Sequence, residues 1–251
     1  MSFVLEASHL RKQFGGLVAV ADVSLRVREG SLHSIIGPNG AGKTTLFNLL
    51  SGALKPTTGR VVLRGRDITG LPPYRMAHLG IGRSYQITNI FPNLTVLENV
   101  RLAAQAMGHD NWKFWRAASA FQEYEARARE IIERVGLQDK MRAPANTLAH
   151  GDKRKLELEI LLAQDPEVLL LDEPTAGMAS EQVPELMKLI AEIRARGNKT
   201  IVLVEHNMDI VMNVSDEITV MHLGNVLAEG TAKEIAANQV VQKAYLGELY
   251  N

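Results

Sequence analysis

The sequence predicts an α/β fold with a parallel sheet at its core, an antiparallel β edge and an inserted helical subdomain. Two short segments, Val168–Leu171 and Thr200–Val204, are almost entirely apolar, as strands buried on both faces of a parallel sheet are. Between them Glu181–Arg196 has helical composition, and Gly197 closes that helix. Alternating strands and helices of this kind are typical of a parallel sheet covered by helices.

The N-terminal third supplies the predicted β edge and the first core strand. Its strand-like segments are short, rich in branched residues and separated by Gly, Pro and charged turns. These segments are Phe3–Ser8, Val23–Val27, Leu32–Ile36 and Val61–Leu63.

The middle of the chain has a helical pattern instead. Phe114–Val135 carries apolar residues at helical spacing, and Glu130 and Arg134 form a favourable i,i+4 pair on that helix. We therefore expect one domain over residues 1–251, with a core of 1–86 and 165–235, a helical insert of about 87–164 and a C-terminal tail of 236–251.

Composition excludes several function classes. The 251 residues contain no cysteine, which rules out disulfides, cysteine-ligated zinc, iron–sulfur clusters and thiol catalysis. Lys plus Arg and Asp plus Glu both number 28, so the net charge is +0, which argues against nucleic-acid binding through bulk charge. Apolar runs such as Val168–Leu171 are far shorter than the roughly 20 residues that span a bilayer.

The strongest motif lies directly after the predicted strand Leu32–Ile36. It matches G-x-x-x-x-G-K-[ST] and is followed by an apolar helix, Thr44–Leu50, which is the context of a phosphate-binding loop. Such a loop turns backbone N–H groups toward phosphate oxygens, its lysine reaches the β- and γ-phosphates, and its Thr hydroxyl binds Mg²⁺. The sequence thus predicts a P-loop NTPase core that binds ATP and Mg²⁺ through Gly37, Pro38, Asn39, Gly40, Ala41, Gly42, Lys43, Thr44 and Thr45.

A pair of carboxylates ends the predicted strand Val168–Leu171. Asp172 and Glu173 follow it directly, and ligands of α/β sheets bind at the carboxyl ends of strands. We expect Asp172 to hold Mg²⁺ and Glu173 to act as the general base that activates the attacking water. Alone, the pair could equally be an acidic surface turn before Pro174; the upstream phosphate loop favours a hydrolase.

With these motifs in this order, the chain resembles the nucleotide-binding subunit of ABC transporters over essentially its whole length. The resemblance implies that Phe14 stacks on adenine, that Gln86 contacts Mg²⁺ and links the nucleotide to the membrane subunit, and that His206 faces the γ-phosphate. Taken singly, Phe14 would more often be a core aromatic, Gln86 an ordinary loop residue and His206 a structural histidine.

Two loops depart from the pattern of that family. The family's signature loop reads Leu-Ser-Gly-Gly-Gln, and Ala149 and Asp152 differ from it here, so that Asp152 beside a phosphate would need Lys153 or Arg154 to offset its charge. Farther on, Ala179 stands where many members have an aspartate that contacts the partner subunit. The resemblance implies that the loop binds the partner's ATP through Ala149, His150, Gly151 and Asp152.

Within the family, the chain is similar to the branched-chain amino acid uptake group. The similarity rests on Phe14–Val20, Phe91–Val100, Glu173–Met178 and Tyr245–Glu248. It implies an importer ATPase at the cytoplasmic face of the inner membrane, attached peripherally. Its partners would be membrane permease subunits, a second ATPase subunit in a homo- or heterodimer and, indirectly, a periplasmic solute-binding protein.

The sequence leaves three alternative functions open. The same group includes importers for urea, short amides and other small solutes. An ABC-type ATPase acting on nucleic acid would need coiled-coil arms, zinc modules or two fused halves, and the chain has one phosphate loop and no cysteine; we expect no nucleic-acid partner. A solitary nucleotide-dependent regulator would leave Gln86, Gly151 and His206 unexplained.

Overall fold

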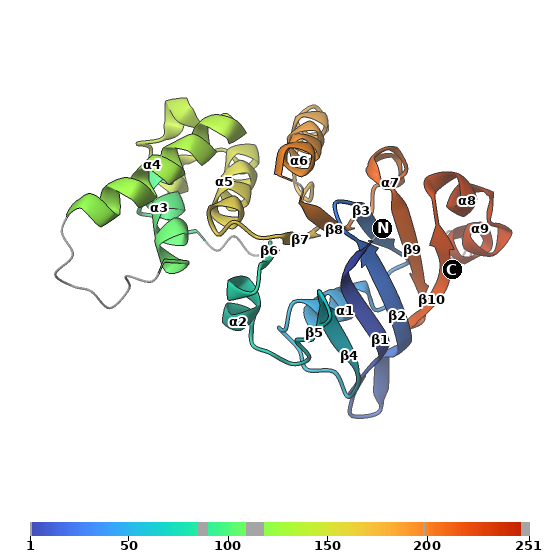
Figure 1. Ribbon diagram of the computed structural model, residues 1–251. Helices are drawn as coiled ribbons and strands as arrows, with labels where there is room; N and C mark the ends of the chain where they lie inside the picture. The colour runs from blue at the N-terminus through green and yellow to red at the C-terminus, as the bar shows by residue number, and fades with distance from the viewer. Residues whose placement is uncertain (1, 85–89, 109–117, 198, 247–251) are drawn as a thin grey trace. The chain divides into compact units, whose positions relative to one another are not determined.

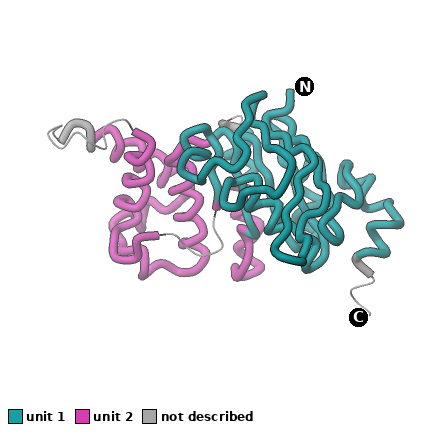
Figure 2. The backbone as a smooth tube through the Cα atoms, turned by 90° about the horizontal axis from the view of Figure 1, so that it is seen from below, with its two compact units in different colours: residues 1–83, 167–173, 190–251 teal, residues 84–166, 174–189 magenta. Residues whose placement is uncertain are grey.

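The computed structural model describes residues 2–84, 90–108, 118–197 and 199–246. Within them the chain forms two compact units (Figure 2). Unit 1 comprises residues 1–83, 167–173 and 190–251, and unit 2 comprises residues 84–166 and 174–189.

Unit 1 is built on one ten-stranded sheet with the order β5-β4-β1-β2-β10-β9-β3-β8-β7-β6 (Figure 1). Strands β3, β8, β7 and β6 run parallel to one another, and β9 is also parallel to β3. The rest pair antiparallel, apart from one parallel bridge between β10 and β2. The strands are β1 Phe3–Phe14, β2 Leu17–Arg28, β3 Leu32–Ile36, β4 Thr58–Leu63, β5 Arg66–Asp67, β6 Ile81–Arg83, β7 Val168–Asp172, β8 Thr200–Val204, β9 Glu217–His222 and β10 Asn225–Gly230.

The centre of the sheet is the most deeply buried part of unit 1. Every residue of β3, β7 and β8 is buried, which explains why these strands have no hydrophobic alternation in the sequence. The helices of unit 1 are α1 Lys43–Leu50, α2 Pro73–His78, α7 Met208–Val214, α8 Ala232–Ala237, α9 Gln239–Leu246 and the last part of α6 Val183–Gly197. Helix α1 contributes fully buried Leu46 and Phe47 to the core.

Unit 2 is helical. It contains α3 Val96–Ala106, α4 Ala118–Val135, α5 His150–Ala163, the first part of α6 and two short 3₁₀ turns, Gln138–Lys140 and Ala145–Thr147. Thr95 and Glu98 form a reciprocal capping box at the start of α3, which satisfies two otherwise orphaned backbone donors. The buried residues of α4 recur at helical spacing at Ala128, Ile131, Ile132 and Val135.

The predicted α/β architecture is confirmed, and β3 and β8 have the predicted bounds. Strands β1 and β2 are each 12 residues long, so the expected ends of Phe3–Ser8 and Val23–Val27 are wrong. The pairing of β1 with β2 contains irregularities on both sides of Leu10, and His9 has a φ of 49°. These irregularities break the alternation of polar and apolar residues on which the sequence prediction depends. Residues 114–117 of the predicted helix lie outside the described residues.

No helix among the described residues is both long enough and apolar enough to cross a membrane.

Helix α5 contains a carboxyl group whose burial gives a stability prediction. Glu159 has no exposed surface, and neither of its carboxyl oxygens has a hydrogen-bond partner. Burial raises the pKa of Glu159 to about 9, with Lys155 lowering it and Asp152 adding to the rise. Between the ordinary pKa of 4.5 and the raised pKa of about 9, Glu159 ionises in the unfolded chain but keeps its proton in the folded chain. The free energy of unfolding therefore falls as the pH rises through this window.

Glu159→Gln is expected to remove that part of the pH dependence. Urea unfolding at pH 5 and pH 8 should show a smaller loss of unfolding free energy at the higher pH than in the parent chain. Glu130→Gln is the matched control, because Glu130 on α4 is exposed and paired with Arg134 at 3.0 Å. If Glu159→Gln and the parent lose stability equally between the two pH values, Glu159 is ionised in the folded protein.

Candidate active site

The predicted phosphate loop connects β3 to α1 within unit 1 (Figure 1). Lys43 is the first residue of α1 and is only 6% exposed. Its ammonium group donates hydrogen bonds to the carbonyl oxygens of Gly37 at 2.5 Å and Pro38 at 2.9 Å. The lysine therefore holds the loop in its curled form and keeps a positive charge inside it.

Glycine is required at two places where the loop passes close to other backbone. A Cβ on Gly37 would lie 2.2 Å from the carbonyl oxygen of Met221, and one on Gly42 would lie 2.4 Å from that of Ala19. Gly42 has a φ of 99° and precedes α1 without any side-chain cap. The N–H groups of the first turn of α1 thus lack a capping side chain, and a helix N-terminus in that state favours an anion.

The loop also offers polar groups to solvent. Asn39, Gly40 and Thr44 are exposed, and a Cβ built on Gly40 would meet nothing within 4 Å. The loop is therefore open to solvent at Gly40, and Thr44 is accessible to a cation that accompanies a bound phosphate. The residues present fit Mg²⁺ with a nucleotide, since Mg²⁺ is bound through one or two protein oxygens plus substrate phosphates.

The sheet brings three of the other predicted residues, Asp172, Glu173 and His206, to the same edge as this loop. Strand β8 pairs in parallel with both β3 and β7, with Val204 opposite Ile35 on one side and Asp172 on the other. The carboxyl ends of the three strands therefore lie side by side, where α/β sheets bind ligands. The phosphate loop leaves β3, Asp172 and Glu173 end β7, and His206 follows β8.

Asp172 is almost completely buried, with 2% of its surface exposed. Burial raises its pKa, and the guanidinium group of Arg83, 3.6 Å from Oδ2, opposes that rise. Its position at the end of a buried strand gives a carboxylate with little freedom to move, which suits a ligand that orients a cation.

Glu173 and His206 form a close pair. The Nε2 atom of His206 lies 2.7 Å from Oε1 of Glu173. The Glu173 backbone N–H donates to the carbonyl of Val204 at 2.8 Å, which fixes the chain where it leaves β7. Glu173 also has a φ of 48°, a conformation that costs a non-glycine residue about 1–3 kcal/mol and often marks a functional site. The arrangement allows the histidine to orient the proposed base.

Two polar residues near this edge escaped the sequence analysis. Arg83, at the end of β6, donates to the Ser51 hydroxyl at 2.6 Å, and its guanidinium also lies 5.1 Å from the Phe47 ring centre. It thereby connects the end of α1 with Asp172. Glu205 is 4% exposed and accepts a hydrogen bond from the His206 backbone N–H at 3.1 Å. The only signal in the sequence for Glu205 is its position between Val204 and His206.

Of the two remaining predicted residues, Phe14 and Gln86, the structure describes only Phe14. Phe14 is the last residue of β1 and is 44% exposed, with the Lys12 ammonium 5.0 Å from its ring centre. An exposed ring at a strand end is available to stack on a base, so its predicted role stays a prediction. Gln86 lies outside the described residues.

The predicted signature loop belongs to unit 2, where it begins α5. Ala149 is the N-cap residue and supplies no side-chain hydrogen bond. Asp152 forms an ion pair with Lys140 from the first 3₁₀ turn, a partner that the sequence did not indicate beside Lys153 and Arg154. Arg154 instead binds Glu157 at 2.8 Å. The sequence could not show this pairing, because Lys140 is brought to α5 by the fold of the intervening turns.

Two glycines near the start of α5 are closely packed. A Cβ on Gly151 would lie 2.6 Å from Oε1 of Gln182, and one on Gly177 would lie 3.1 Å from the His150 ring. These approaches bring the start of α5 against the segment that follows β7, all within unit 2. Ala179, at the predicted contact with a partner subunit, lies in the same segment.

Ala149→Ser is expected to stabilise the chain, because serine supplies the missing N-cap acceptor for α5. Replacing alanine by serine at an N-cap is worth about 0.5–2 kcal/mol, which urea unfolding can measure. Ala149→Val is the control, since valine occupies the same position without an acceptor. A gain of unfolding free energy in both variants, or in neither, would contradict the capping argument.

Comparisons with known proteins place this site in a family. The family model described as "ABC transporter" matches residues 20–176, more than half of the chain. A second model, described as "Branched-chain amino acid ATP-binding cassette transporter", matches residues 225–250. The chain is 43% identical over 250 residues to the high-affinity branched-chain amino acid transport ATP-binding protein LivG of Salmonella typhimurium, covering 98% of each chain. It is 42% identical over 252 residues to BraF of Pseudomonas aeruginosa, again covering 98% of each.

Solved structures agree with the fold. A nucleotide-free ATP-binding cassette from an ABC transporter superposes with a TM-score of 0.86 at 31% identity, covering 97% of this chain and 99% of that one. The ADP conformation of an ATP-binding cassette of an ABC transporter superposes with a TM-score of 0.84 at 30% identity, covering 98% and 100%. The phosphate loop, the strand-end carboxylates and these matches lead to one conclusion: the chain belongs to the ABC transporter family and is an ATP-binding, ATP-hydrolysing subunit of it.

Proposed function

We propose that this ATPase energises the import of branched-chain amino acids. The observation that carries the proposal is the match of residues 225–250 to the branched-chain amino acid cassette model, beyond the part of the chain common to ABC transporters. The relatives LivG and BraF, which are 43% and 42% identical over nearly the whole chain, support it. Urea or short amides are the alternative solutes.

Within the site, the chain's own residues have the following proposed roles. The backbone N–H groups of Gly37–Thr45 and the ammonium of Lys43 bind the β- and γ-phosphates, and Phe14 stacks on adenine. Thr44, Asp172 and Gln86 hold Mg²⁺, which neutralises phosphate charge when it is bound. The hydrogen bond of 2.7 Å between Glu173 and His206 supports a base held in place beside the γ-phosphate.

The proposed working unit is a dimer of ATPase subunits on two permease subunits. In such a dimer, Ala149, His150, Gly151 and Asp152 contact the ATP held by the partner's phosphate loop. The family relationship supports this arrangement, and one related cassette is described as a dimer in a post-hydrolysis state bound to ADP and Pi. Closure around ATP moves the permeases because ATP binds the closed state more tightly than the open one.

We place the subunit at the cytoplasmic face of the inner membrane, held there by the permeases, with a periplasmic solute-binding protein acting on the far side. We also retain the predicted organisation of one domain, with a core of 1–86 and 165–235, an insert of about 87–164 and a tail of 236–251. The family assignment supports both statements.

The experiment is a solute comparison in the assembled transporter. The chain would be purified with its two permeases, reconstituted in proteoliposomes and tested with the cognate binding protein loaded with leucine, isoleucine, valine, urea or acetamide. We expect the branched-chain amino acids alone to stimulate phosphate release. Stimulation by urea or acetamide instead would select the alternative.

A further inference from the structure

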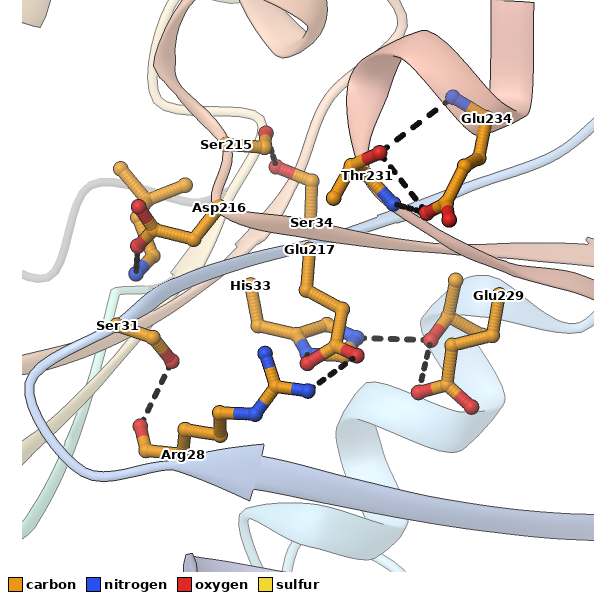
Figure 3. Close-up of polar contacts among 12 residues, drawn as sticks. Arg28, Ser31, His33, Ser34, Ser215, Asp216, Glu217, Glu229, Thr231 and Glu234 are labelled. Carbon is orange, nitrogen blue, oxygen red and sulfur yellow. Dashed lines mark hydrogen bonds and ion pairs between the residues drawn. The ribbon is translucent and has the colours of Figure 1, made fainter. Parts of the chain in front are cut away.

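Three side chains of the types that bind metal ions lie together in unit 1, away from the phosphate loop. His33 on β3, Glu217 on β9 and Glu229 on β10 come from neighbouring strands, and their ligand atoms all lie within 4.8 Å of one another (Figure 3). His33 pairs with Glu217 in the register of β3 and β9, and Glu229 pairs with Thr219 in that of β9 and β10. The cluster therefore lies near the amino end of β3, opposite the end that enters the phosphate loop.

The His33 ring is completely buried, and one of its nitrogens has no hydrogen bond. Its Nε2 lies 2.7 Å from the Thr219 hydroxyl, which in turn donates to Oε1 of Glu229 at 3.3 Å. Because that hydroxyl proton is given to Glu229, the hydroxyl accepts from Nε2–H of His33, which leaves a lone pair on Nδ1. Nδ1 has no hydrogen-bond partner and lies 3.7 Å from Oε2 of Glu217.

A nitrogen lone pair close to a carboxylate oxygen is an arrangement that a cation between them would stabilise. The other oxygen of Glu217, Oε1, lies 3.4 Å from the Arg28 guanidinium, so Oε2 is the oxygen left toward His33. A distance of 3.7 Å is too long for a hydrogen bond. It is within the span of about 4.2 Å that two metal–ligand bonds of about 2.1 Å can bridge through one ion.

We propose that His33 Nδ1, Glu217 and Glu229 form a binding site for a divalent transition-metal ion of the Zn²⁺ type. One imidazole nitrogen and two carboxylates are ligands that Zn²⁺ accepts, with a fourth position open to water. The contact of the other His33 nitrogen with Thr219 is the outer-shell support that metal-ligating histidines have. Glu229 is exposed, so its side chain is free to turn toward the ion and gives the ion a path in.

The site would join the three neighbouring strands β3, β9 and β10. Strand β3 continues into the phosphate loop, and β10 continues into α8, where Thr231 and Glu234 form a capping box (Figure 3). A bound ion would therefore stabilise the sheet between the loop and the C-terminal segment. An ion that binds the folded chain but not the unfolded one raises the melting temperature with its concentration.

The test uses the full chain, stripped with a chelator and titrated with Zn²⁺ in the absence of nucleotide. Calorimetry should show one saturable equivalent, and nitrogen-15 NMR of the histidine rings should show a shift of Nδ1 in His33. Glu217→Gln and Glu229→Gln should each weaken the affinity by about tenfold or more. Thr219→Val, which keeps the shape but loses the support, should weaken it by about 10–100-fold. Each variant's circular dichroism and melting temperature without metal would show that it is folded.

Two controls separate this site from other histidines. Asp22→Asn removes an exposed pair in which the carboxylate lies 3.0 Å from His9, and His206→Ala removes the pair with Glu173. Both should bind Zn²⁺ as the parent does. The proposal is overturned if no saturable equivalent is found, if the NMR shift falls on another histidine, or if the two Glu-to-Gln variants bind with unchanged affinity.

Discussion

Lys43→Ala is expected to abolish measurable ATP binding while leaving the fold intact. The ammonium group is buried and bonded to two carbonyl oxygens of the loop, so its loss loosens the loop locally and removes the positive charge proposed to bind the phosphates. Hydrogen bonds to charged groups contribute about 1.5–3 kcal/mol each, and two or three of them correspond to a loss of affinity of several orders of magnitude. Calorimetric titration with ATP at matched Mg²⁺ measures the effect.

Lys233→Ala is the matched control for that variant. Lys233 is exposed on α8 of the same unit, so it tests the loss of one positive charge from unit 1 without touching the loop. We expect its nucleotide affinity to equal that of the parent chain. If Lys43→Ala also bound ATP with the affinity of the parent chain, the assignment of this loop to phosphate binding would be contradicted.

Glu173→Gln is expected to keep ATP binding and to slow hydrolysis by about 10²–10⁴-fold, the usual contribution of a general base. The substitution preserves size, and the glutamine oxygen can still accept the hydrogen bond that His206 makes with Glu173 at 2.7 Å. The geometry therefore persists while the basicity is lost. Phosphate release under saturating ATP gives the rate, and size-exclusion chromatography with ATP should show a trapped dimer.

Glu181→Gln serves as the control, since Glu181 is an exposed carboxylate eight positions farther along the chain. Its turnover and its elution with ATP should match those of the parent. Turnover of Glu173→Gln at the parent rate would place the base elsewhere, and monomeric elution with bound ATP would contradict closure between two subunits.

The local parts of the site could be predicted from the sequence. The phosphate loop is a continuous motif, and its strand and helix flank it directly, so β3 and α1 were expected almost to the residue. Asp172 and Glu173 could be placed because an apolar run ends at them. In each case the physical signal is contained within about ten consecutive residues.

The parts that depend on distant residues could not be predicted. Arg83 reaches Asp172 only because β6 pairs with β7. Lys140 reaches Asp152 because the fold brings the first 3₁₀ turn beside the start of α5. His33, Glu217 and Glu229 meet because β3, β9 and β10 are neighbours in the sheet. Such contacts follow from strand order, and nothing in the short-range pattern around any one of these residues specifies it.

Leucine uptake into proteoliposomes tests most directly the claim that this chain hydrolyses ATP to drive import. The liposomes would contain the permeases with either the parent chain or Lys43→Ala, ATP and Mg²⁺ on the ATPase side, and leucine-loaded binding protein on the other. The account predicts leucine accumulation that requires ATP and is absent with Lys43→Ala. Equal accumulation with both chains, or none with the parent chain while ATP is hydrolysed, would contradict it.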